Sequence, residues 1–118
     1  MRAKDGLGRY GEDVAARHLV DEGLVLLARN WRCTEGEIDI VARDGDVLVV
    51  CEVKTRRGTA HGTPVEAVTA TKANRLQVLA LRWLAVHSAT PRAVRFDVVA
   101  VLADGHGAAA VDHRLGVI

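Results

Sequence analysis

The chain has 118 residues, enough for one domain around one hydrophobic core, and 49% of them are hydrophobic, which excludes a disordered chain. Sixteen Lys and Arg nearly balance fifteen Asp and Glu, giving a formal net charge of +1, so a nucleic-acid-binding face would need local segregation of charge. With two Trp, one Tyr and one Phe, base stacking on aromatic side chains is excluded as a main binding mode.

The cysteines and histidines predict neither a disulfide nor a zinc site. Cys33 and Cys51 stand far apart, and no Cys/His pair has the spacing of metal ligands. Residues 1–13 contain no apolar signal core, and no apolar run is long enough to cross a membrane. We therefore expect a protein of the reducing cytoplasm with no membrane partner.

The first third of the chain predicts one helix and one strand. Residues 1–7 are basic and glycine-containing and are expected to fray. Helical spacing of apolar residues predicts a helix from about Gly8 to Glu22, which Gly23 ends. The apolar run Leu24–Trp31 predicts a strand, and Thr34–Gly36 predicts a turn.

The segment Glu37–Lys54 predicts a β-hairpin, because two apolar strands flank the turn sequence Asp44-Gly45-Asp46. An exposed, Arg-rich loop is expected at 55–62. Thr63-Pro64-Val65-Glu66 combines a capping box with proline at the first helical position, which predicts the start of a second helix. This helix is expected to reach about His87, with a break near 69–71.

The remaining residues predict two strands. Ala93–Leu102 reads as a strand, Asp104–Gly107 as a turn and Ala108–His113 as a weaker final strand. The predicted order is therefore α-β-β-β-α-β-β. This order indicates an α/β protein in which a single domain over residues 1–118 has a mixed central β-sheet flanked by helices.

The register of the hairpin decides which side chains meet. A two-residue turn places Asp39, Glu52 and Lys54 on one face of the sheet. If Asp44 and Gly45 are the two central residues of the turn, Asp39 faces Val50. If Gly45 and Asp46 are central, Asp39 faces Glu52. A three-residue loop would shift the register by one and send Asp39 to the other face.

Both faces of the predicted hairpin are apolar. The face of Asp39 also carries Val41, Leu48 and Val50, and the opposite face carries Ile38, Ile40, Val47, Val49 and Val53. An unpaired charge buried in such surroundings costs several kcal/mol, which a divalent cation shared by the carboxylates would offset. Oxygen ligands without a nearby Cys or His favour Mg²⁺ or Mn²⁺ over zinc.

This arrangement predicts phosphodiester chemistry. Asp39 and Glu52 would hold the cation against a scissile phosphate and activate water. Lys54 points the same way as Glu52 and would orient that water or stabilise charge on the phosphorane. The alternative is a structural ion cluster of Asp39, Glu52 and Lys54, since Glu-x-Lys is common on exposed strands.

Several other polar residues have two interpretations each. Glu12 borders the buried face of the first helix and would either complete the metal shell or pair with an arginine. Glu37 would either support the metal ligands or close the turn at Gly36. Asp97 is predicted to be a buried partner of Arg95 or of the helix rather than a ligand, and His61 to be a surface histidine rather than a proton shuttle.

Basic residues flank the same region. Lys72 shares a helical stripe with apolar residues and should point toward the sheet edge. Binding of nucleic-acid phosphates, which would weaken steeply with salt, is predicted for Arg9, Arg56, Arg57, Lys72 and Arg75. A solvated basic fringe is the alternative for each of them.

Four motifs together resemble the YraN-like family of uncharacterised bacterial proteins. They are Gly8-x-x-Gly-Glu12, Arg29-Asn30-x-Arg32, Gly36-Glu-Ile-Asp-Ile40 and Cys51-Glu-Val-Lys-Thr-Arg56, and the match extends to Lys72 and to Arg95-Phe-Asp97. That family is similar in fold to restriction-endonuclease-like proteins of the PD-(D/E)xK type, and more closely to archaeal Holliday junction resolvases. By this resemblance Glu12, Asp39 and Glu52 match metal-ligand positions, and Lys54 matches the motif lysine.

The resemblance implies an Mg²⁺-dependent endonuclease that acts on branched or otherwise structured DNA in repair or recombination. Resolvases of this fold work as dimers because two cuts need two active sites, so a homodimer is also implied. Two other functions stay open. One is a nucleic-acid-binding module that keeps the carboxylates but has little turnover, and the other is a structural or interaction protein in which the cluster only stabilises the sheet.

Overall fold

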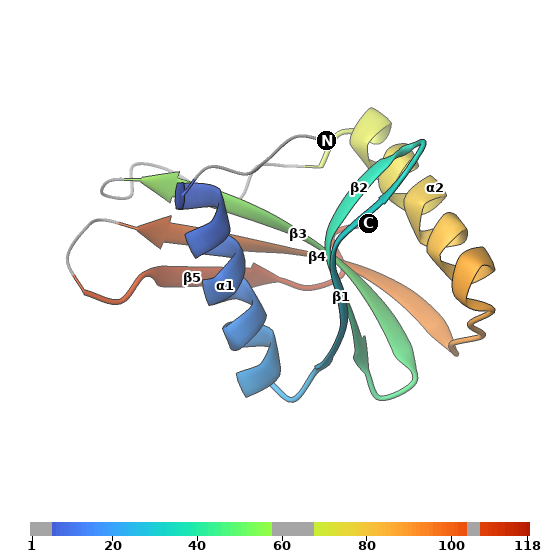
Figure 1. Cartoon of the computed structure of the whole chain (residues 1–118), viewed down its shortest axis with the longest axis horizontal. Coiled ribbons are helices and arrows are strands. Elements are labelled where there is room, and N and C mark those ends of the chain that lie inside the picture. The colour runs from blue at the N-terminus through green and yellow to red at the C-terminus, as the bar shows by residue number, and fades with distance from the viewer. Residues whose placement is uncertain (1–5, 58–67, 104–106) are drawn as a thin grey trace.

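Two helices cover opposite faces of one five-stranded sheet (Figure 1). The computed structural model describes residues 6–57, 68–103 and 107–118. Its elements are α1 (Gly6–Asp21), β1 (Val25–Cys33), β2 (Gly36–Asp44), β3 (Val47–Arg57), α2 (Ala70–His87), β4 (Ala93–Ala103) and β5 (Ala110–Arg114). The element order and the α/β class agree with the prediction from the sequence.

The strands lie in the sheet in chain order, β1-β2-β3-β4-β5. All neighbouring pairs are antiparallel except β3 and β4, which run parallel from Val47↔Ala93 to Arg57↔Ala103. Parallel neighbours need a crossover connection, and α2 lies in that connection. The sheet is therefore mixed, as expected.

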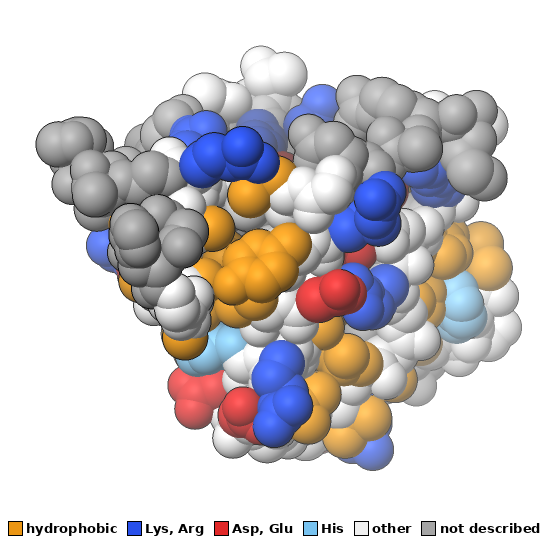
Figure 2. Space-filling view, turned by 60° about the vertical axis from the view of Figure 1, so that its left-hand side comes forward, with side chains coloured by type: hydrophobic (Ala, Val, Ile, Leu, Met, Phe, Trp, Pro, Cys, Tyr) orange, Lys and Arg blue, Asp and Glu red, His pale blue; other side chains and the backbone are white. Residues whose placement is uncertain are grey.

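In the part of the chain that the structure describes, no helix is long and apolar enough to cross a bilayer. On the face shown in Figure 2, basic side chains lie at several separate points, some of them next to acidic ones, with hydrophobic groups between them. On that face the charges of both signs are interspersed, so it carries no continuous basic surface.

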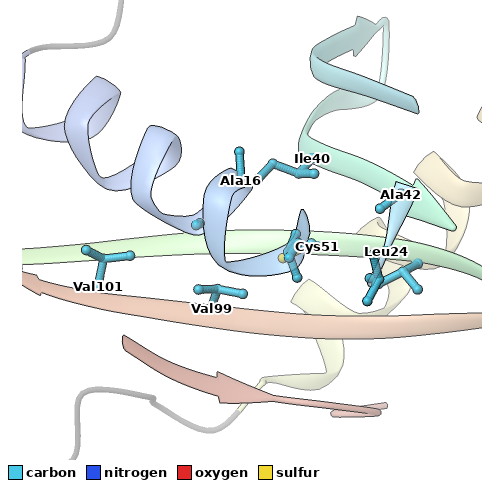
Figure 3. Packing of buried hydrophobic residues seen from close by; sticks show 10 residues of the cluster. Ala16, Leu24, Ile40, Ala42, Cys51, Val99 and Val101 are labelled. Atoms are coloured by element: carbon cyan, nitrogen blue, oxygen red, sulfur yellow. The ribbon is translucent and has the colours of Figure 1, made fainter. Parts of the chain in front are cut away.

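The core has two halves, one on each side of the sheet. On the α1 side, Ala15, Ala16 and Leu19 of the helix pack on strand residues that include Val49 and Cys51 (Figure 3). The α2 side contains Leu76, Leu79, Ala80 and Trp83 of the helix with Val41, Leu48 and Val50 of the hairpin. The alternation of β3 residues between these two clusters follows from the two-residue period of a strand.

The hairpin turn has two central residues. Asp44 pairs with Val47, and the ladder continues to Ile40↔Cys51, so Gly45 and Asp46 are central. Gly45 has φ +61°, a left-handed conformation that glycine adopts without steric cost. This is the second of the two registers considered above, in which Asp39 lies opposite Glu52.

One side-chain direction was predicted wrongly. Ile38 was expected on the same face as Ile40, but it packs on the α2 side while Ile40 packs on the α1 side. The alternation slips at Asp39, which lies opposite Asn30 of β1, between the pairs Arg29↔Ile40 and Trp31↔Ile38. Asn30 has φ +53°, so β1 kinks at this residue. The part of the β1–β2 hairpin beyond the kink therefore turns toward α2.

Some boundaries also differ from the prediction. β3 continues through Thr55 to Arg57, where a loop was expected, because parallel pairing with β4 extends to Arg57. α2 begins at Ala70 after Thr69, whose hydroxyl accepts a hydrogen bond from the Lys72 amide at 3.2 Å. This start coincides with the break expected near 69–71, while the helix start expected at 63–66 lies outside the described residues.

Gly11 of α1 is required for close packing on the sheet. A methyl group at this position would overlap the side chain of Thr55 in β3. We predict that Gly11→Ala lowers the free energy of unfolding by about 1–3 kcal/mol, although alanine is the better helix former. Gly6→Ala is the matched control, because nothing lies within 4 Å of its added carbon. Equal denaturant midpoints for Gly11→Ala and the parent would contradict this packing.

The two thiols should differ in reactivity. Burial raises the pKa of the Cys51 thiol, and the negative charges of Asp97 and Asp39 raise it further. Because the thiolate is the nucleophile, Cys51 should resist alkylation in the folded protein at neutral pH, whereas the half-exposed Cys33 should react. Peptide mass spectrometry after a timed iodoacetamide pulse measures both sites. Similar labelling of the two cysteines before denaturation would disprove the expectation.

Candidate functional site

Asp39 lies where β2 separates from β3. The ladder between these strands ends at Ile40↔Cys51. Just beyond it, Oδ2 of Asp39 accepts a hydrogen bond from the Val53 amide at 2.8 Å. The carboxylate thus binds the β3 backbone amide directly after Glu52, and a hydrogen bond to an ionised acceptor is among the stronger ones in proteins. This contact holds the Asp39 carboxylate against the β3 backbone next to Glu52.

Glu52 is paired with two lysines. Its Oε2 lies 2.6 Å from Nζ of Lys72 in α2 and 3.7 Å from Nζ of Lys54. Burial alone would lower the pKa of Lys72, but its contacts with Glu52 and Lys54 outweigh burial and raise that pKa. The side chains of all three residues are between 18% and 25% exposed, but Oε2 of Glu52, the oxygen that both lysines face, is itself buried. The predicted direction of Lys72 toward the sheet is confirmed.

Glu12 approaches the same region from α1. Its side chain is 2% exposed, and Oε1 accepts hydrogen bonds from Asn30 Nδ2 at 2.7 Å and from Arg29 Nη2 at 3.4 Å. The Asp13 carboxylate, bonded to the same guanidinium at 2.7 Å, is the main cause of the raised pKa of Arg29. Glu12 therefore pairs with an arginine, one of its two expected roles, and Asn30 connects it to the strand position opposite Asp39.

Asn30 is the site residue that reasoning from the sequence missed. Its backbone is left-handed, which Asn tolerates better than most residues, and its side chain binds the buried Glu12 carboxylate. The asparagine that follows the apolar run Val25–Ala28 within the strand was the available signal. Asn30 thus links α1 to β1, and the Asp39–Val53 bond links β2 to β3.

Glu37 lies further along β2 and faces β1. Its Oε2 is 3.6 Å from Nε of Arg32, its cross-strand partner, and its Oε1 is buried without a hydrogen-bond partner in the described part of the chain. Support of the metal ligands by Glu37 stays a prediction. An open depression of about 420 Å³ at the tip of the β1–β2 hairpin is lined by Glu37 and the five residues before it.

The remaining basic candidates are exposed. Arg9 lies on α1, and Arg56 and Arg57 end β3. Arg75 lies on α2, and its Cδ is 4.0 Å from the position that a Cβ atom at Gly36 would occupy. These four residues come from three elements, α1, β3 and α2. Phosphate binding by each of them stays a prediction.

Asp97 is a buried partner of Arg95, as predicted. The guanidinium donates two hydrogen bonds of 2.9 Å to the two carboxylate oxygens, and the Asp97 side chain is fully buried. Burial by itself would raise the pKa of Asp97, but the bonds from Arg95, His113 and the Gly116 amide lower it. His61 lies outside the described residues.

Comparison with known proteins gives consistent matches along the whole chain. The family model described as "Uncharacterised protein family UPF0102" matches residues 11–101. A UPF0102 protein of Beutenbergia cavernae is 60% identical over 117 residues, covering 99% of both chains. A UPF0102 protein of Streptomyces coelicolor is 58% identical over 119 residues, covering 99% of this chain and 92% of the relative. The chain therefore belongs to the UPF0102 family, the YraN-like family that its motifs resemble.

Proposed function

We propose that this chain is an Mg²⁺-dependent endonuclease that hydrolyses phosphodiester bonds in structured or branched DNA, with Mn²⁺ as a substitute metal. One observation carries the proposal. Asp39 is bound to the β3 backbone next to Glu52, and the Glu52 carboxylate is in turn paired with Lys54. Two coordinated cuts in a junction need two active sites, so the proposal includes a homodimer.

The donor chemistry of the three acids suits a hard divalent cation. Asp39 and Glu52, with Glu12 directly or through water, would hold it with carboxylate oxygens, the donors that Mg²⁺ prefers. Burial is the main cause of the raised pKa of the Cys51 thiol, and the negative charges of Asp97, Asp39 and Glu52 raise it further, so both acids place negative charge in this part of the sheet. Such a cation would neutralise charge on the scissile phosphate and make an attacking water more acidic.

The lysines would act on the phosphate. Lys54 lies within 3.7 Å of Glu52 and would stabilise negative charge that develops on the phosphate oxygens. Lys72 occupies the Glu52 carboxylate at 2.6 Å, so binding of a cation there requires this ion pair to open. The released ammonium is then available to the DNA backbone, together with Arg9, Arg56, Arg57 and Arg75.

The test is cleavage of end-labelled four-way junctions, with duplex and single strands compared, in Mg²⁺, Mn²⁺ or EDTA. We expect metal-dependent cleavage that falls about 100-fold or more in Asp39→Asn and in Glu52→Gln. Asp46→Asn is the matched control, because Asp46 is an exposed acid that pairs with Arg92 in the hairpin turn. Cleavage by Asp39→Asn at the parental rate, or cleavage that persists in EDTA, would refute the proposal.

DNA binding with little turnover is the second candidate. The short Lys72–Glu52 ion pair favours it, because an ammonium already neutralises one of the acids that a cation would need. In this case Glu52→Gln should bind DNA at least as tightly as the parent, since a negative charge is removed, and no variant should cleave.

Salt dependence tests the phosphate contacts under either candidate. Arg56→Ala should weaken DNA binding and reduce the slope of log K against log salt by roughly one unit. Arg17→Ala is the control, because Arg17 is an exposed arginine that pairs with Asp21 on α1. Equal slopes for Arg56→Ala, Arg17→Ala and the parent would remove Arg56 from the interface.

A further inference from the structure

His18, Glu22 and His113 bring three metal-ligating groups together on the α1 side of the sheet. One ligand atom from each lies within 4.8 Å of the other two. His18 lies on α1, Glu22 directly follows the last residue of that helix, and His113 comes from β5. The sequence predicted no zinc site because no Cys/His pair had ligand spacing. The cluster instead joins His18 and Glu22, which are four residues apart, to a histidine 95 positions beyond His18 in the chain.

The distance between the two imidazoles suits a tetrahedral ion. Nε2 of His18 lies 3.2 Å from Nδ1 of His113. Two nitrogens bound to Zn²⁺ at about 2.0–2.1 Å in tetrahedral geometry are about 3.3 Å apart. Oε1 of Glu22 is 3.9 Å from Nε2 of His18, and the Glu22 side chain is 59% exposed, so it is free to move closer.

The buried surroundings orient His113 for ligation. Its Nε2 lies 2.8 Å from Oδ2 of Asp97, whose carboxylate accepts hydrogen bonds and is held by Arg95. Nε2 must therefore carry the hydrogen, which leaves the lone pair of Nδ1 directed at His18. A carboxylate bound to the far nitrogen of a histidine is the usual support of a zinc ligand.

We propose that His18, Glu22 and His113 form a binding site for a transition-metal ion, with Zn²⁺ the expected occupant, and that Asp97 is its positioning residue. Two imidazoles and one carboxylate match zinc sites with three protein ligands, in which the fourth position takes water or an external ligand. Bound there, the metal would link α1 to β5 and so tie the edge of the sheet to the helix.

This site is separate from the Asp39–Glu52 edge. His18 lies six residues beyond Glu12 on α1, about 9 Å along a helix. The two donor sets also differ in chemistry, since imidazoles select zinc and carboxylates alone select magnesium. Loss of one site therefore need not affect the other.

The test uses the full chain without a histidine tag, stripped with a chelator and titrated with Zn²⁺ by calorimetry, alongside thermal melting. We expect one Zn²⁺ per chain and a rise in melting temperature of several degrees at saturating metal. His18→Gln should abolish both effects, and Glu22→Gln, an exposed substitution, should weaken binding about 10-fold or more. Bound Co²⁺ should show the intense visible absorption of tetrahedral coordination.

Two controls distinguish this site from others. His87→Gln removes a histidine at the end of α2 that stacks on Trp83, and it should leave Zn²⁺ binding unchanged. Asp39→Asn should also retain Zn²⁺ binding, whatever it does to DNA cleavage. Parental Zn²⁺ affinity in His18→Gln, or no Zn²⁺ binding by the parent chain, would overturn the proposal.

Discussion

The bond between the Val53 amide and the Asp39 carboxylate determines the shape of the candidate site. At this point β2 stops pairing with β3, and a side-chain oxygen replaces the next strand contact. On the other side of β2, Asn30 takes a left-handed conformation and its side chain binds Glu12. The kink and the reversal of side-chain direction at Ile38 therefore share one structural cause.

Charge around this point is balanced by partners from several elements. Glu52 is neutralised by Lys72 and Lys54, whereas Glu12 pairs with Arg29 and accepts a hydrogen bond from Asn30. A partly buried carboxylate needs such partners because desolvation is costly. Each partner also competes with a metal cation for its acid. Whether lysine or a metal ion occupies the acids is therefore the physical difference between a catalytic protein and a binding protein.

The local parts of this structure could be predicted from the sequence, and the non-local parts could not. Asp44-Gly45-Asp46 and the two-residue period of the flanking apolar residues were sufficient to predict the hairpin and the shared location of Asp39 and Glu52. Choosing between the two registers required coordinates. Ile38 was misplaced because the kink arises from contacts between β1, β2 and α1. His18 and His113 meet only because β5 pairs with β4 beneath α1, which no local pattern encodes.

The parallel pairing of β3 with β4 has a consequence for assembly. The acids of the hairpin lie close together in the sequence, so a tight turn is enough to bring them together. Val47, by contrast, reaches its partner Ala93 only after α2 and its connections have been placed. Closing so long a loop has an entropic cost before any contact repays it, which is why high contact order slows folding. The acids of the hairpin thus depend on local contacts, whereas Lys72 of α2 reaches Glu52 only through the long crossover connection between β3 and β4.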